Sequence, residues 1–209
     1  MTIIELFSGT STFTEVAKSR GHHAVSIDKY EPANLQADVL ELSGKGILET
    51  LGLYTVDVPW ASPPCQSFSV ASMGKMWERA GVPKHPTAEL GLALMRKTVA
   101  LIEELNPIAW FIENPRGMMR KTPPLDEMHK QTVTYCQYGA DYMKPTDIWT
   151  NVTDWVPRPM CKNGDPCHVS APRGSKTGIQ GIKGAKARGA LPVQLCEEVL
   201  DAAERWVNG

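Results

Sequence analysis

The alternation of short apolar runs with segments of helical periodicity constrains the fold of this chain more than any other feature. Four apolar runs, separated by glycine, proline or polar residues, are typical of strands: 2–7, 23–27, 56–61 and 108–112. Apolar residues recur at helical spacing in three further segments: 12–20, 87–105 and 191–206. Strands that alternate with helices predict an α/β protein with a doubly wound, mainly parallel sheet.

Side chains capable of chemistry follow these predicted strands. Asp28, Cys65 and the pair Glu113-Asn114 each come soon after an apolar run. Because the carboxyl ends of parallel strands share one edge of the sheet, where ligands bind, we expect these residues to gather there.

The first predicted strand is joined to a helix by a tight turn at Gly9. Glycine lets a ligand approach the backbone, and the amides of the helix N-terminus would face a nucleotide-like ligand. Thr12 and Glu15 have the spacing of a capping box at the start of that helix. Asp28 is placed to accept hydrogen bonds from a ribose diol, although an aspartate without a ligand is also common at a strand end.

Cys65 and Glu113 form the sharper signal. Pro63 and Pro64 fix the backbone before Cys65, and the polar turn around it could stabilise a thiolate, although a lone cysteine can also be an inert core residue. Glu113 leaves an apolar strand, where burial favours a protonated carboxyl. A thiol nucleophile and a proton-donating carboxyl are what addition to a pyrimidine ring requires.

Together these segments resemble the cytosine-5 DNA methyltransferase family. Pro64-Cys65-Gln66-x-Phe68-Ser69 matches the catalytic motif of that family, and Glu113-Asn114 matches its Glu-Asn motif. Four shorter segments resemble its first, second, third and last motifs: 5–13, 27–28, 38–39 and 188–201. The resemblance implies a fold of the S-adenosylmethionine-dependent methyltransferase type, with S-adenosyl-L-methionine as cofactor and DNA as partner.

The resemblance also implies roles for single residues. Cys65 would attack C6 of a flipped-out cytosine, Glu113 would protonate or hydrogen-bond N3, and Asn114 would position the site. The residues implied to contact S-adenosyl-L-methionine are Phe7, Gly9, Asp28 and Asp38. The segment 67–86, rich in glycine, serine and proline, is a candidate lid over the extruded base.

The chain departs from the family pattern in two places. Where the family has Gln-x-Arg-x-Arg, Lys144 can stand for one arginine, but Thr146 occupies the place of the arginine that contacts the cytosine carbonyl. In addition, only 37 residues, 152–188, occupy the place of the target-recognition domain. We therefore expect one domain with a catalytic core at 1–151, a short basic insert at 152–188 and a returning helix at 189–209, with specificity that is short, relaxed or supplied by a second chain.

The insert carries the basic residues of a predicted nucleic-acid contact. The net charge of the chain is −1, but residues 158–188 alone carry +6, which suits either a phosphate-binding track or a solvated loop. The residues predicted to contact nucleic acid are Arg173, Lys176, Lys183, Lys186 and Arg188.

The insert also offers ligands for a metal. Three thiols and an imidazole could form a tetrahedral zinc site that staples a loop without its own core, and the four candidates are Cys136, Cys161, Cys167 and His168. Incidental or buried thiols are the alternative, since the spacing is not a common zinc pattern.

The same sequence contains partial matches to two other classes of enzyme. Pro166-Cys167-His168 could offer a thymidylate-synthase-like nucleophile, but the rest of that pattern is absent; zinc deaminase chemistry fails because no second cysteine follows Cys65 at the required spacing. An RNA cytosine methyltransferase and a DNA-binding relative with weak turnover are the two functions that the sequence leaves open.

An odd number of cysteines, five, and the lack of an apolar run of membrane-spanning length predict a cytoplasmic protein without a membrane partner.

Overall fold

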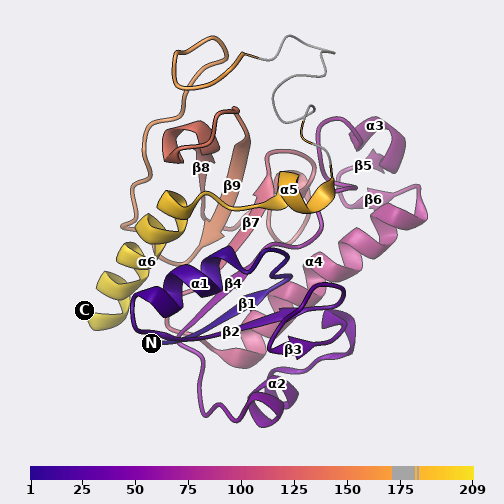
Figure 1. The fold of residues 1–209 in the computed structure, drawn as a ribbon. Helices are drawn as coiled ribbons and strands as arrows, with labels where there is room; N and C mark the ends of the chain where they lie inside the picture. The colour runs from indigo at the N-terminus through magenta and orange to yellow at the C-terminus, as the bar shows by residue number, and fades with distance from the viewer. Residues whose placement is uncertain (171–181, 183) are drawn as a thin grey trace.

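The fold is built on a seven-stranded sheet in the order β3-β2-β1-β4-β7-β9-β8 (Figure 1). The computed structural model describes residues 1–170, 182 and 184–209. The first five strands in this order are parallel, whereas β9 runs antiparallel to both of its neighbours. The strands are β1 (Thr2–Leu6), β2 (His23–Asp28), β3 (Leu35–Gln36), β4 (Val58–Ala61), β7 (Phe111–Pro115), β8 (Lys130–Thr134) and β9 (Pro145–Thr150).

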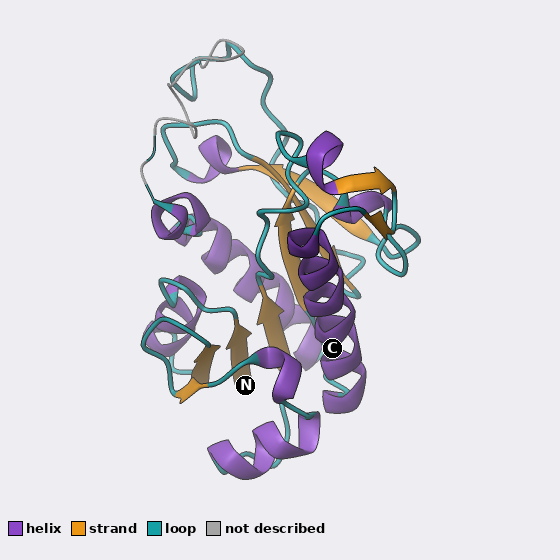
Figure 2. Cartoon of the chain, turned by 90° about the vertical axis from the view of Figure 1, so that its right-hand side faces the viewer, coloured by secondary structure: helices purple, strands orange, loops and turns teal. Residues whose placement is uncertain are grey.

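Helices cover both faces of this sheet, so the predicted doubly wound α/β architecture is confirmed (Figure 2). One apolar cluster joins the sheet to α2 and α4, and a second joins the other face to α1 and α6. Among the described helices, none is long and apolar enough to cross a bilayer. The helices are α1 (Thr12–Ser19), α2 (Gly44–Leu51), α3 (Met73–Met76), α4 (Pro86–Leu105), α5 (Ala185–Gly189) and α6 (Val193–Asn208).

The predicted helix at 87–105 is confirmed as α4, with its apolar face buried. Leu94, Thr98 and Leu101 are buried, while Leu90, expected on the same face, is 52% exposed. The His85 side chain accepts a hydrogen bond from the Thr87 amide at 3.1 Å, which satisfies one free amide of the first turn.

The start of α1 differs from the prediction. The N-cap is Ser11, and no capping box forms. The Thr14 amide donates instead to the Glu5 carboxylate at 2.8 Å, so an acid on β1 takes the place of the expected capping residue. Glu5 is only 2% exposed, and this contact fixes α1 directly to the sheet.

The segment 67–86 is more ordered than an irregular lid. It contains α3 and a two-stranded hairpin of β5 (Trp77–Arg79) and β6 (Val82–Pro83). The Trp77 indole donates to the Ser67 carbonyl at 2.8 Å, and its ring lies 5.2 Å from that of Phe68, both being buried. The hairpin is therefore anchored beside the loop that carries Cys65.

Candidate active site

The antiparallel strand β9 brings two residues to the edge where Cys65 and Glu113 lie. Thr134, at the end of β8, pairs with Pro145, at the start of β9, so Tyr135 and Lys144 stand at the carboxyl edge of the parallel strands. This edge is where a doubly wound sheet binds its ligands. Neither β8 nor β9 was expected from the apolar pattern.

Cys65 lies in a loop that two contacts hold in place. The Asn114 side-chain amide donates to the Pro63 carbonyl at 2.7 Å, and the Met118 amide donates to the Phe68 carbonyl at 2.7 Å. A Cβ on Gly117 would lie 2.1 Å from that same Phe68 oxygen, so glycine is required for this close approach. Asn114 is fully buried, and its hydrogen bond holds the backbone two residues before Cys65.

Burial and the neighbouring Glu113 carboxylate raise the pKa of the Cys65 thiol, whereas Lys144 and Arg188 oppose the rise. Local dipoles therefore do not outweigh burial, contrary to the expectation of a thiolate stabilised by its turn. The half-buried Cys65 thiol therefore holds its proton more tightly than an exposed cysteine would.

Glu113 interacts with two partners that lie next to the antiparallel strands β8 and β9. Tyr135 Oη donates to Glu113 Oε1 at 2.9 Å, and Lys144 Nζ lies 3.8 Å from the same oxygen. Lys144 Nζ also lies 4.4 Å from the centre of the Tyr135 ring and donates to the Arg188 carbonyl at 3.1 Å. All three side chains of this triad are buried, so their interactions are little screened by water.

Thr146 cannot supply the positive charge that the family pattern has at its position. It is fully buried in β9 opposite Pro115, and its hydroxyl donates to the Lys144 carbonyl at 3.3 Å. Lys144, which directly precedes β9, is therefore the cation that reaches Glu113.

The loop between β1 and α1 has an unusual backbone conformation. Phe7, Gly9 and Ser11 have left-handed φ values of 57°, 51° and 53°, which are costly for residues other than glycine. The Ser8 hydroxyl is buried without a partner among the described residues. A Cβ on Gly9 would meet no atom nearer than the Phe7 oxygen at 4.0 Å, apart from its chain neighbours, so space for a ligand lies beside it.

Asp28 ties this loop to the end of β2. One carboxylate oxygen accepts from the Gly9 amide at 2.9 Å, and the other accepts from the Tyr30 and Glu31 amides at 2.8 and 2.9 Å. Asp38 lies two residues after β3 and caps the 3-10 helix η1 (Val39–Glu41). Its carboxylate accepts from Lys29 Nζ at 2.7 Å, and this contact lowers the pKa of Asp38.

Comparison with known proteins places this geometry in a family. Residues 1–134 match the family described as C-5 cytosine-specific DNA methylase. The chain belongs to this family. A Frog virus 3 (isolate Goorha) protein named "Probable DNA (cytosine-5)-methyltransferase" is 30% identical over 96% of this chain and 99% of its own length.

One solved structure supports the fold of this methylase-family chain. A protein described as a prophage-encoded DNA modification methyltransferase from E. coli superposes with a TM-score of 0.53 at 18% identity, over 72% of this chain and 46% of its own. The chain thus spans about half the length of that structure. S. pombe Dnmt2 methyltransferase gives a TM-score of 0.45 at 14% identity, over 72% of this chain and 48% of its own.

The basic residues of the methylase-family insert are described only in part. Arg173, Lys176 and Lys183 lie outside the described residues, and Lys186 belongs to α5. Arg188 lies close to the active site. Its backbone carbonyl accepts a hydrogen bond from Lys144, and its charge opposes the rise in the pKa of the Cys65 thiol. In Figure 1, α5 lies above the carboxyl ends of the central strands.

The four predicted metal ligands do come together. Their sulfur and nitrogen atoms lie within 4.8 Å of one another. Cys167, the thymidylate-synthase-like alternative to Cys65 as nucleophile, belongs to this cluster. Its thiol lies 3.5 Å from His168 Nδ1.

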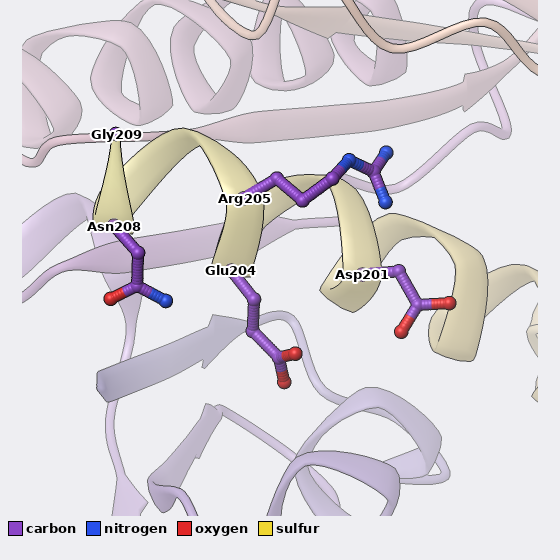
Figure 3. A pocket seen from close by; sticks show the side chains of 5 residues that line it. All are labelled: Asp201, Glu204, Arg205, Asn208 and Gly209. Atoms are coloured by element: carbon purple, nitrogen blue, oxygen red, sulfur yellow. The ribbon is translucent and has the colours of Figure 1, made fainter.

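A separate pocket lies on the last turns of α6, lined by Asp201, Glu204, Arg205, Asn208 and Gly209 (Figure 3). Arg20 pairs with Asp201 and Glu204 at 2.6 and 2.8 Å, and His22, which directly precedes β2, lies 2.8 Å from Glu204. This pocket is therefore near the amino ends of the parallel strands, and it plays no part in the chemistry described here.

Proposed function

We propose that the protein transfers a methyl group from S-adenosyl-L-methionine to C5 of cytosine in DNA, with Cys65 as covalent nucleophile. The observation that carries this proposal is the meeting of Cys65 with the Glu113–Tyr135–Lys144 triad at one edge of the sheet. A lone buried cysteine would need no such partners. A thiol beside a carboxyl and a cation suits addition to a ring that must gain a proton or a hydrogen bond at N3.

The first step joins Cys65 Sγ to C6 of the flipped-out base. Glu113 presents a proton to N3, so the electron pair displaced from the C5–C6 double bond is accommodated as an enamine. A proton on Glu113 also removes the negative charge that raises the pKa of Cys65. Binding of the base to a protonated Glu113 would therefore favour the thiolate at the moment when it is needed.

The cofactor, when bound, supplies the methyl group from its sulfonium. The residues that would hold it are Phe7, Gly9, Asp28 and Asp38, and the open space beside Gly9 and the unpartnered Ser8 hydroxyl fit a ligand there. C5 takes the methyl group, and the cofactor would leave as its neutral thioether. A base then removes H5, the Sγ–C6 bond breaks to release the Cys65 thiolate, and N3 returns its proton to Glu113, which restores the aromatic ring.

Lys144 is the residue that we assign to the cytosine carbonyl, in place of the missing arginine at Thr146. Its ammonium group is buried, lies over the Tyr135 ring and reaches Glu113. A lysine offers a point charge rather than a planar fork, so we expect weaker discrimination of the base than an arginine would give.

In this proposal the short insert at 152–188 takes the place of a target-recognition domain. Its length of 37 residues and charge favour contacts with phosphates over contacts with base edges. We place the protein in a reducing, cytoplasmic compartment, since its five cysteines are free thiols.

The test is transfer of a labelled methyl group to duplex DNA, single-stranded DNA and tRNA, followed by sequencing of the modified sites. Duplex DNA containing 5-fluorocytosine should trap a denaturant-stable adduct that Cys65→Ser abolishes and Cys167→Ser retains. Labelling of tRNA alone would transfer the proposal to RNA. Cofactor binding without transfer to any substrate would contradict it in favour of a binding protein.

A further inference from the structure

Four soft ligand atoms from two distant segments meet beside the start of the insert. Cys136 comes from the 3-10 helix η3 (Tyr135–Tyr138), and Cys161, Cys167 and His168 come from the loop after β9. Cys136 Sγ lies 2.9 Å from Cys161 Sγ, and His168 Nδ1 lies 3.8 Å from Cys161 Sγ and 3.5 Å from Cys167 Sγ.

The two distances to His168 are those of a tetrahedral metal site, whereas the Cys136 and Cys161 thiols, 2.9 Å apart, must separate when an ion binds between them. With Zn–S bonds of about 2.3 Å and Zn–N bonds of about 2.0–2.1 Å, ligand atoms at the corners of a tetrahedron lie ~3.5–3.8 Å apart. We propose that Cys136, Cys161, Cys167 and His168 bind one structural zinc ion. Four protein ligands leave no open position, and Cys136 and Cys161 are only 7% and 5% exposed, as suits a structural rather than a catalytic ion.

The polypeptide around the ligands is shaped for this role. Between Cys161 and Cys167 the chain turns, with the Lys162 amide donating to the Asp165 carboxylate at 2.6 Å and the Asp165 amide to the Lys162 carbonyl at 3.1 Å. The Gln137 side-chain amide lies 3.5 Å from Cys167 Sγ, as a donor to a metal-bound thiolate would.

The insert has a physical need for such a staple. Met160 and Val169, the apolar residues that flank the ligands, are 41% and 62% exposed, so this part of the chain buries little apolar surface of its own. A loop without a core can be held by a metal instead.

The ion would also connect the insert to the active site. Cys136 directly follows Tyr135, whose hydroxyl holds Glu113. Zinc at Cys136 would therefore fix both the insert and the short helix from which Tyr135 reaches the catalytic carboxyl.

The test is metal analysis of the full chain, purified with reductant and without chelator. We expect about one zinc per chain, and loss of most of it in Cys136→Ser and in Cys161→Ser. Cys65→Ser is the matched control, since its thiol lies outside the cluster and should leave the zinc content unchanged. His168→Cys should retain zinc, because four thiolates also form a tetrahedral site.

A second measurement uses the wild-type protein and so does not depend on whether the variants fold. Wild-type protein reconstituted with Co²⁺ should show the visible bands of tetrahedral cobalt with thiolate charge transfer. A chelator should open the insert to limited proteolysis. Wild-type protein that holds no zinc and gives no such cobalt spectrum would overturn the proposal, as would a Cys136–Cys161 disulfide in protein kept under reductant. None of these readouts requires methyl transfer, so failure here is distinguishable from failure of the proposed function.

Discussion

Tyr135 Oη donates a hydrogen bond to Glu113 Oε1 at 2.9 Å, although Glu113 lies on β7 and Tyr135 directly follows β8, and β9 separates these two strands in the sheet. Burial and the Glu113 carboxylate raise the pKa of Tyr135 well above its ordinary value, so the phenol stays a donor across the whole working range of pH. Glu113 thus has a fixed orientation before any base arrives.

Removing this donor should slow methyl transfer. For Tyr135→Phe we expect kcat to fall about ten- to a hundredfold, since a hydrogen bond to a charged group contributes about 1.5–3 kcal/mol. Cofactor affinity, measured by calorimetry, should not change. Tyr138→Phe is the control: it lies on the same short helix but bonds Glu198 at 2.8 Å. Equal losses in both variants would mean that Tyr135 acts only through stability.

Lys144 should control the reactivity of Cys65. Its charge opposes the rise in the pKa of that thiol, so Lys144→Met should raise the pKa further, and Lys144→Arg should keep it near the wild-type value. The measurement is the pH dependence of Cys65 alkylation, followed on the Cys65 peptide by mass spectrometry. An unchanged pH profile of Cys65 alkylation in Lys144→Met would show that Lys144 does not influence the Cys65 thiol.

The apolar pattern predicted the parallel half of this site, and the family resemblance pointed to Lys144, but neither predicted Tyr135 or the strands β8 and β9. Cys65, Glu113 and Asp28 follow strands with continuous apolar runs, because those strands are covered on both faces. Strands β8 and β9 contain Thr132, Thr134, Thr146 and Asp147, whose polar side chains hide the strand pattern. Asp147 is fully buried only because Arg120 pairs with it at 2.7 Å, a long-range contact that local periodicity does not reveal.

The cofactor assignment of Asp28 can be tested by binding. Three backbone amides occupy part of its carboxylate, which still has capacity for a ribose hydroxyl. Asp28→Ala should weaken S-adenosyl-L-methionine binding by about 1.5–3 kcal/mol. Asp57→Ala is the matched control, since Asp57 likewise accepts from a backbone amide, that of Thr2 at 2.7 Å, but at the amino ends of the strands. Unchanged affinity in Asp28→Ala would exclude the assignment.

Glu5 should make the protein less stable as pH rises through neutrality. Burial raises the pKa of Glu5 from 4.5 to about 7, although the hydrogen bonds from Thr14 oppose the rise. Between these two values the folded protein binds the proton more tightly than the unfolded chain, so its contribution to stability is full below pH 4.5 and is lost as pH approaches 7. The size of the loss is on the order of 3 kcal/mol.

Glu5→Gln removes the ionisation but keeps an oxygen that can accept from the Thr14 amide. Denaturant unfolding of this variant should depend less on pH between about 5 and 8 than that of the wild-type protein. Glu49→Gln, at an exposed position on α2, should leave the wild-type dependence in place. Identical curves for wild type and Glu5→Gln would show that Glu5 ionises freely in the folded state.

The last prediction concerns how the insert contacts DNA. If Arg173 and Lys176 contact phosphates, reversing both to glutamate should weaken binding almost equally for all duplex sequences, because phosphates carry no sequence information. The slope of log affinity against log salt should fall by about 0.9 for each lost contact, so by about two for the pair.

Reversal of Lys18 and Lys45, on α1 and α2, changes the net charge by the same amount and is the control. Because that control alters only the long-range field, it should lower affinity at low salt while leaving the slope near its wild-type value. A change of preference among sequences without a general loss would mean that the insert reads base edges instead. A flat salt dependence in the wild-type protein would mean that it does not touch the backbone at all.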